Sequence, residues 1–121
     1  MCEFGPLEQA IMDVVWAADR PYSVREVRER LHYGRPVAYT TVMTVLGILH
    51  GKGVLCREKR GRAWQYWPAE SREERQARLM AEALRSSGDD QATMRRFVER
   101  VSEDEMECLR EAVLDATPPA E

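Results

Sequence analysis

The 121-residue sequence lacks any apolar run close to the roughly 20 residues that a membrane-spanning helix needs. Its N-terminus also lacks the basic stretch followed by an apolar stretch that marks a secretory signal peptide. We therefore expect neither a membrane span nor a signal peptide, and we expect a soluble protein of the cytoplasm.

Cysteine and histidine are both scarce. The three cysteines, Cys2, Cys56 and Cys108, form no C-x-x-C pair, and their odd number and wide spacing argue against a disulfide framework and a structural zinc site. The two histidines, His32 and His50, lack the companions that a metal site or a nucleophile-base pair needs. We expect reduced thiols, no metal and no cofactor.

The residues of an active site are missing as well. The sequence offers no paired carboxylates, no activated nucleophile and no glycine loop that could cradle a phosphate. We therefore expect that the protein is not an enzyme.

The net charge of -3 conceals an asymmetry along the chain. Residues 1–70 carry ten Lys or Arg against eight Asp or Glu, whereas residues 71–121 carry eight against thirteen. Between Arg35 and Trp67 there are six cations, and the only anion is Glu58. A local positive strip on an acidic protein can bind phosphate without binding every polyanion.

The first half of the chain has the pattern of three helices. Pro6 opens an apolar stripe of helical spacing that continues to Ala18. Ser23 and Glu26 form a capping box that begins a second helix. A third helix is predicted from about residue 38 to residue 52, because its apolar residues recur at spacings of three and four.

The period then changes from helix-like to strand-like. Residues 54–59 and 63–67 are short strand-like runs on either side of residues 60–62, which predict a hairpin turn. Trp64 and Tyr66 lie two apart, so both should lie on one side of a strand, and we expect both to pack against the helices. Three helices followed by a basic hairpin predict a winged helix-turn-helix.

The third helix offers a surface suited to reading DNA. With Val42 at the centre of the buried side, Thr40 and Thr44 lie on the opposite side, and Thr41 and Met43 lie at its edges. Threonine supplies a hydroxyl and a methyl group that reach base edges in the major groove. A solvated helix face is the alternative, but β-branched residues are poor helix formers and their number here favours function.

The cations of the hairpin are the second set of candidate DNA contacts, because flexible cations on a wing reach phosphates or a minor groove. All the residues predicted to contact DNA are Tyr39, Thr40, Thr41, Met43, Thr44, Arg57, Lys59, Arg60 and Arg62.

The tail carries two more capping boxes, Ser71 with Glu74 and Ser102 with Glu105, and three short amphipathic helices. A tail of this length does not easily make a core of its own, so we expect its apolar faces to meet those of a second copy. Residues 1–70 are thus the predicted winged-helix domain and residues 71–121 the helical dimerisation region. The predicted dimer contacts are Leu79, Met80, Leu84, Met94, Phe97, Val98, Val101, Met106, Leu109 and Val113.

Several segments resemble one family of bacterial regulators. They are Gly5-Pro6-Leu7-Glu8, Tyr22-Ser23-Val24-Arg25-Glu26-Val27, Ala38-Tyr39-Thr40-Thr41-Val42-Met43-Thr44-Val45-Leu46 and Gly61-Arg62-Ala63-Trp64. The third segment is the most specific, and a weaker likeness continues through Phe97-Val98-Glu99 and Ser102. The chain is similar to the penicillinase-repressor (BlaI/MecI) type of transcriptional regulator.

This resemblance implies a homodimer that binds a palindromic operator, represses genes such as those for β-lactamase, and dimerises through its C-terminal helices. It also implies a membrane sensor protease as a partner, which in such repressors cleaves just before a Phe-Val-Glu-like segment. The matching bond lies between Arg96 and Phe97, and relatives with well-established cleavage have asparagine where this sequence has Arg96. Copper-responsive relatives have paired cysteines near the C-terminus, whereas Cys108 stands alone.

Two other functions stay open at the level of the sequence. A winged helix also serves as a protein-interaction module, since the fold alone does not establish DNA binding. A regulator that senses a small molecule between the winged helix and the tail is the second, although no convergent polar cluster supports it.

Overall fold

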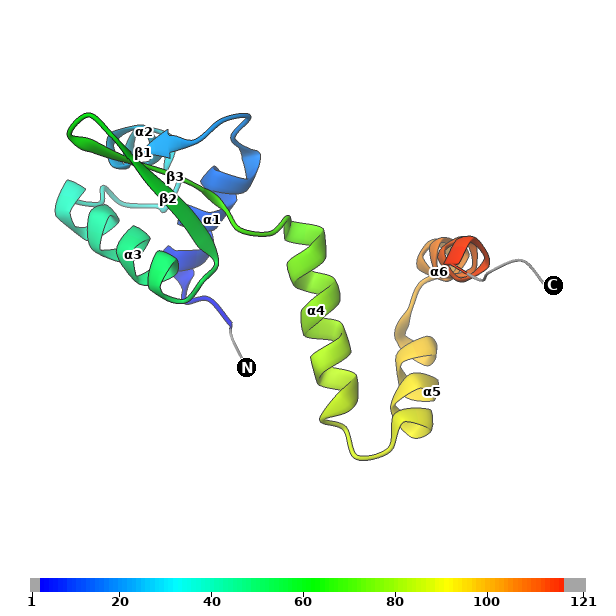
Figure 1. Cartoon of the computed structure of the whole chain (residues 1–121). Coiled ribbons are helices and arrows are strands. Elements are labelled where there is room, and N and C mark those ends of the chain that lie inside the picture. Colours follow the sequence, from blue (N-terminus) through cyan, green and yellow to red (C-terminus); the bar gives the residue numbers. More distant parts are fainter. Residues whose placement is uncertain (1–2, 117–121) are drawn as a thin grey trace. The chain divides into compact units, whose positions relative to one another are not determined.

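A computed structural model describes residues 3–116 of the chain (Figure 1). Within these residues the protein is mostly helical and has one small antiparallel sheet. The elements in order are α1 (Pro6–Ala17), β1 (Tyr22–Ser23), α2 (Val24–Arg30), α3 (Tyr39–Gly51), β2 (Leu55–Arg60), β3 (Ala63–Pro68), α4 (Arg72–Arg85), α5 (Asp90–Arg100) and α6 (Glu103–Ala116).

The chain divides into two compact units, and the division falls inside α4, between Ala77 and Arg78. The first unit contains α1, α2, α3, the sheet and the beginning of α4. The second contains the rest of α4 with α5 and α6.

Local signals fix where the first two helices begin. Pro6 occupies the first turn of α1, and the Gly5 backbone N–H donates to the Glu8 carboxylate at 3.1 Å. Ser23 caps α2: its hydroxyl accepts the Glu26 N–H at 3.2 Å, and its own N–H donates to the Glu26 carboxylate at 3.1 Å. The predicted capping box is therefore confirmed.

The sheet has the strand order β1-β3-β2, and both pairings are antiparallel. The predicted hairpin is confirmed, with Arg60 opposite Ala63. Gly61 lies in the turn at φ 64°, a conformation that the first turn position of a type II′ hairpin requires. The sequence analysis did not foresee β1, whose Tyr22 pairs with Tyr66 on the outer side of β3.

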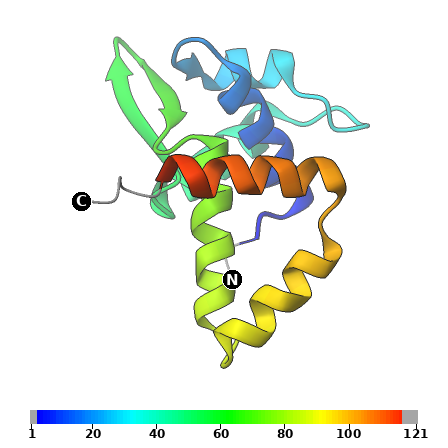
Figure 2. The ribbon, with the colours of Figure 1, turned by 90° about the vertical axis from the view of Figure 1, so that its right-hand side faces the viewer.

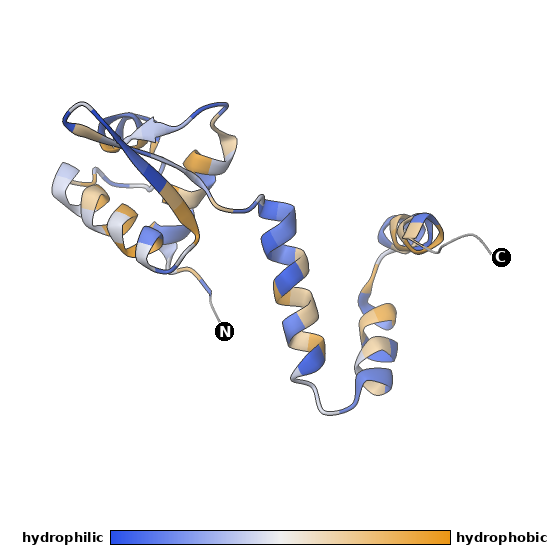
Figure 3. Ribbon diagram, in the orientation of Figure 1, coloured by the Kyte–Doolittle hydropathy of each residue, from blue (hydrophilic) through white to orange (hydrophobic). Residues whose placement is uncertain are grey.

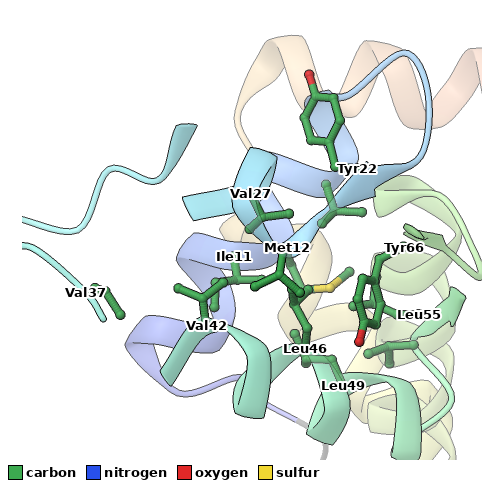
Figure 4. Close-up of a cluster of buried hydrophobic side chains, with 13 residues drawn as sticks. Ile11, Met12, Tyr22, Val27, Val37, Val42, Leu46, Leu49, Leu55 and Tyr66 are labelled. Carbon is green, nitrogen blue, oxygen red and sulfur yellow. The ribbon is translucent and has the colours of Figure 1, made fainter. Parts of the chain in front are cut away.

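One apolar core holds the first unit together (Figure 4). Side chains from α1, α2, α3 and the sheet meet there, and Ile11, Val27, Leu46 and Leu49 are completely buried. Burial of an aliphatic side chain of this size contributes about 1.5 to 3 kcal/mol. Because one side of α3 packs against this core, its opposite side faces outward.

The prediction that Trp64 and Tyr66 both pack against the helices is half wrong. Tyr66 is only 1% exposed and lies in the core, whereas Trp64 is 37% exposed. Both side chains belong to the same side of β3, as the alternation requires. The hairpin extends beyond the helices, however, so the core ends between these two residues.

The first turn of α4 is attached to the winged-helix unit. The Trp16 indole N–H donates to the Glu70 carbonyl at 3.1 Å, and Arg72 pairs with Asp13 at 2.7 Å. The guanidinium of Arg75, itself nearly buried, lies 3.8 Å from the centre of the Phe4 ring. These contacts make the start of α4 part of the first unit rather than of the tail.

The second unit consists of the rest of α4 together with α5 and α6 (Figure 2). Asp89 caps α5 by accepting the Ala92 N–H at 3.1 Å, and the predicted box of Ser102 and Glu105 caps α6. No residue of α5 or α6 is buried. Apolar and polar residues alternate around each helix, as Figure 3 shows in orange and blue.

Candidate nucleic-acid interface

The outward side of α3 consists of the residues that the sequence predicted. Val42, Leu46 and Leu49 are buried, which confirms the predicted phase of the helix. The exposed residues of its first half are Tyr39, Thr40, Thr41, Met43 and Thr44. This surface carries hydroxyl and methyl groups and no charge, so it can enter a groove without an electrostatic preference of its own.

The hydroxyl of Thr44 is already engaged within the helix. It donates to the Thr40 carbonyl at 2.9 Å, the bond that threonine commonly makes one turn back along a helix. Its proton is therefore committed, and its oxygen can only accept. Thr44 thus offers a methyl group and a hydrogen-bond acceptor, which suit a thymine methyl or a base amino group.

Gly47 has no packing reason to be glycine. A Cβ built on it would meet nothing within 4 Å. A glycine inside a helix costs about 1 kcal/mol relative to alanine. The cost is consistent with close approach of another molecule to the backbone of α3 at this position.

The hairpin carries four cations, two of them close to the Trp64 ring and two at or beside the turn. The ladder places Lys59 opposite Trp64, and the guanidinium of Arg57 lies 4.2 Å from the centre of the Trp64 ring. The Lys59 ammonium lies 5.8 Å from the same ring. Arg60 and Arg62 are exposed at and beside the turn. Trp64 therefore restrains two cations by its ring and leaves their charge uncancelled.

The role of Trp64 is what the sequence analysis missed. The signal for it was present, because a two-residue turn at Gly61 places residue 59 opposite residue 64. An aromatic residue flanked across the strands by cations at positions 57 and 59 is typical of a cation–π arrangement rather than of a core position.

None of the four wing cations forms an ion pair with any carboxylate among residues 3–116. Some cations elsewhere in the first unit do: Lys52 pairs with Glu8 at 2.8 Å, and this contact holds the pKa of the Glu8 carboxyl below its ordinary value. The wing therefore keeps a positive charge that the protein itself does not neutralise.

The predicted dimer contacts all belong to the second unit, and all but Val101, which follows the end of α5, lie on its helices. Leu79, Leu84, Val101, Met106 and Leu109 are partly buried. The others are exposed: Met80, Met94, Phe97, Val98 and Val113. Several exposed large apolar side chains on one unit are typical of an interaction surface.

Arg96 and Phe97, the residues of the predicted cleavage bond, lie inside α5. Arg96 is exposed and pairs with Glu99 at 3.3 Å. Cys56 is half-buried, Cys108 is exposed, and Cys2 lies outside the described residues. Residues 3–116 contain no group of three or more His, Cys, Asp or Glu side chains arranged to hold a metal ion.

The fold and the basic hairpin define a winged helix-turn-helix regulator. Residues 4–115 match the family described as penicillinase repressor, and the chain belongs to that family. It is 42% identical over 118 residues to the transcriptional regulator BlaI of Mycobacterium tuberculosis, in strain CDC 1551 / Oshkosh and in strain H37Rv alike. Each match covers 95% of this chain and 86% of the relative.

The protein is thus a transcriptional repressor of the penicillinase-repressor family and not an enzyme. The resemblance stated from the sequence motifs is confirmed. Within residues 3–116, no helix combines the length and the apolar character that crossing a membrane requires.

Proposed function

We propose that the protein binds DNA sequence-specifically in the cytoplasm, as a homodimer on a palindromic operator, and represses genes of β-lactam resistance or related genes. The proposed DNA contacts are Tyr39, Thr40, Thr41, Met43 and Thr44 of α3 and the four wing cations. The named relative is a BlaI regulator, which supports the assignment to such genes.

One observation carries the proposal: an uncharged hydroxylic helix surface belongs to the same unit as a hairpin whose cations have no carboxylate partner within residues 3–116. A helix of this kind fits the major groove, where base edges are read by hydrogen bonds and methyl contacts. Cations beside it bind phosphates and fix the orientation of the helix without reading sequence. In Figure 1 the hairpin turn and the N-terminal end of α3 both lie at the left of the first unit.

The tail supports the homodimer. Phe97 and Val98 are exposed on α5, and α6 contributes further exposed apolar residues such as Val113 and Leu114. Pairing with a second copy would remove these surfaces from water, at about 25 cal/mol for each Å² of apolar surface buried. A two-fold symmetric dimer presents two copies of α3, so the matching DNA site is a palindrome.

The experiment begins with selection of bound duplexes from a random pool, followed by anisotropy measurements on the selected and on a random duplex over a range of salt. The logarithm of the affinity should fall with the logarithm of salt, with a slope of about -0.9 for each phosphate neutralised. Arg60→Ala should weaken binding to both duplexes alike. Arg95→Ala removes the same charge from exposed α5 and serves as the matched control.

Two results would refute the proposal. Absence of any selected sequence, together with recovery of a stable protein complex, would identify a protein-interaction module. Binding to DNA that requires an added small molecule would identify a ligand-sensing regulator instead.

Inactivation by a membrane sensor protease is part of the proposal. The Arg96–Phe97 bond must leave the helix before a protease can cut it. No residue of α5 is buried within the chain, so the proposed pairing with a second copy is the main contact that opening would have to break. Mass spectrometry of repressor recovered from β-lactam-treated cells should detect a fragment that begins at Phe97. An intact chain under conditions that relieve repression would exclude this route.

A further inference from the structure

A hollow of about 430 Å³ opens at the turn between α2 and α3. Three arginines line it, Arg25, Arg28 and Arg35, together with a single carboxylate, Glu29. The side chain of Tyr39, the first residue of α3, completes its rim. We call this feature the basic hollow.

Two of the three arginines are held by uncharged partners. The Arg28 Nε donates to the Val37 carbonyl at 2.9 Å, and the guanidinium of Arg35 lies 5.2 Å from the centre of the Tyr33 ring. A carbonyl or a ring restrains an arginine without cancelling its charge. Among residues 3–116, Arg25 alone of the three is ion-paired, with Glu29 at 3.1 Å, and both members of that pair are well exposed. The hollow therefore keeps a positive excess, which suits an anion.

The position of the hollow indicates which anion. Tyr39 belongs both to its rim and to the exposed surface of α3, and Thr40 follows directly. If α3 lies in a major groove, a group in the hollow lies where the sugar-phosphate wall passes the N-terminal end of the helix. That wall carries one phosphate per nucleotide, and arginine binds phosphate in a bidentate manner.

We infer that the basic hollow binds a backbone phosphate of the operator, held by Arg28 and Arg35 with Arg25 at the rim. The inference rests on the proposed DNA binding and adds a phosphate contact that the hairpin does not supply. None of the three arginines was among the residues predicted to contact DNA, and Arg35 was counted only in the positive strip, because the turn brings residues 25 and 35 together only in the folded chain.

Arg35→Gln is the primary variant, because Arg35 is exposed and makes no bond to the backbone of the turn among the described contacts. Arg25→Gln is the second. Arg30→Gln is the matched control, because Arg30 lies on α2 as Arg25 does but lines a different hollow, which contains Asp13. Like Arg28 and Arg35, Arg30 is held by uncharged groups, here the Tyr22 ring and the Glu26 carbonyl. All three remove one positive charge. Thermal melting of each variant reports whether the fold is retained.

Anisotropy is measured on the selected and the random duplex over a range of salt. For each half-site of the operator, Arg35→Gln should weaken binding by about fivefold and make the salt slope shallower by about 0.9, so the slope of the homodimer should change by about 1.8 on both duplexes, whereas Arg30→Gln should change neither. Equal effects of Arg35→Gln and Arg30→Gln would overturn the inference, since a loss of net charge would then explain both. An unchanged slope in Arg35→Gln and in Arg25→Gln would overturn it as well.

Inorganic phosphate separates a DNA phosphate from a small phosphorylated ligand. If phosphate stabilises the wild type but not Arg35→Gln in thermal melting, and both bind DNA equally, the hollow serves a small ligand and the inference is wrong. If the wild type binds no duplex, the proposed function itself fails, and this result is distinct from salt-dependent binding that Arg35→Gln leaves unchanged.

Discussion

Thr44 allows a direct test of base reading, because its hydroxyl proton is committed to the Thr40 carbonyl at 2.9 Å. The side chain therefore contributes a methyl group and a hydrogen-bond acceptor to anything that approaches α3. Three substitutions separate these contributions. Thr44→Ser removes the methyl, Thr44→Val removes the acceptor, and Thr44→Ala removes both.

The expected magnitudes follow from the groups removed and are given for each half-site, so each factor applies twice in the proposed homodimer. Burying one methyl contributes about 0.8 kcal/mol, so Thr44→Ser should weaken specific binding by about fourfold. A net hydrogen bond contributes about 1 kcal/mol, so Thr44→Val should cost about fivefold. Thr44→Ala should combine the two, to about twentyfold, within the range of about 1 to 3 kcal/mol for a base contact. Alanine is the better helix former, so a loss of binding would not reflect a weaker helix.

The assay is competition anisotropy on the selected duplex, with a random duplex of equal length as control. Binding to random DNA should stay unchanged in all three variants, because Thr44 carries no charge for a phosphate. Equal losses on the two duplexes would refute the base-reading role of Thr44. Full activity of Thr44→Ala would refute it too.

Four further predictions concern stability and assembly. Phe97→Asp should give monomers in sedimentation, since a charge replaces an exposed aromatic of α5; a surviving dimer would place the pairing surface elsewhere. Gly47→Ala should raise the free energy of unfolding by about 1 kcal/mol yet weaken DNA binding, and stronger binding would contradict close approach of DNA. In chemical denaturation, Tyr66→Ala should cost about 3 to 5 kcal/mol and Trp64→Ala clearly less, because only Tyr66 lies in the core. The hydrogen bond from Arg20 and the Ser23 backbone N–H lower the pKa of Glu26 from 4.5 to about 2, so the stability they add is complete above about pH 4.5 and is lost as the pH falls toward 2. The melting temperature of the wild type should therefore exceed that of Glu26→Gln near neutral pH, and the two should converge in acid.

Local signals predicted most of the fold. The capping box of Ser23 and Glu26 and the glycine of the hairpin turn act through neighbouring atoms, so the sequence alone contains them. The strand β1 could not be found in this way. It has two residues, too few for an alternation, and it exists because Tyr22 meets Tyr66 across a gap of more than forty residues. The prediction for Trp64 failed for a related reason: alternation fixes on which side of the strand a side chain lies, but not where along the strand the core ends.

The candidate site was predictable to a similar extent as the fold. Once Val42 was placed inward, the helix period fixed which residues of α3 face outward. The partners of the cations could not be read from the sequence in the same way. The stacking of Arg57 on Trp64 needs the register of the hairpin, and the contact between Arg28 and the Val37 carbonyl needs the turn between α2 and α3. Both depend on how separate elements meet.

The partners of these cations explain how an acidic protein can keep a positive surface. Arg57 is held by a ring, Arg28 by a carbonyl and Arg35 by another ring, so each is restrained while its charge stays available. Carboxylates in their place would restrain them equally well but would have to be displaced before a phosphate could bind. Restraint by neutral groups also lowers the side-chain entropy lost on binding. The net charge of -3 meanwhile disfavours polyanions that approach any other surface. On the proposed binding mode, affinity for DNA would thereby be confined to the one orientation in which α3, the hairpin and the basic hollow meet the duplex together.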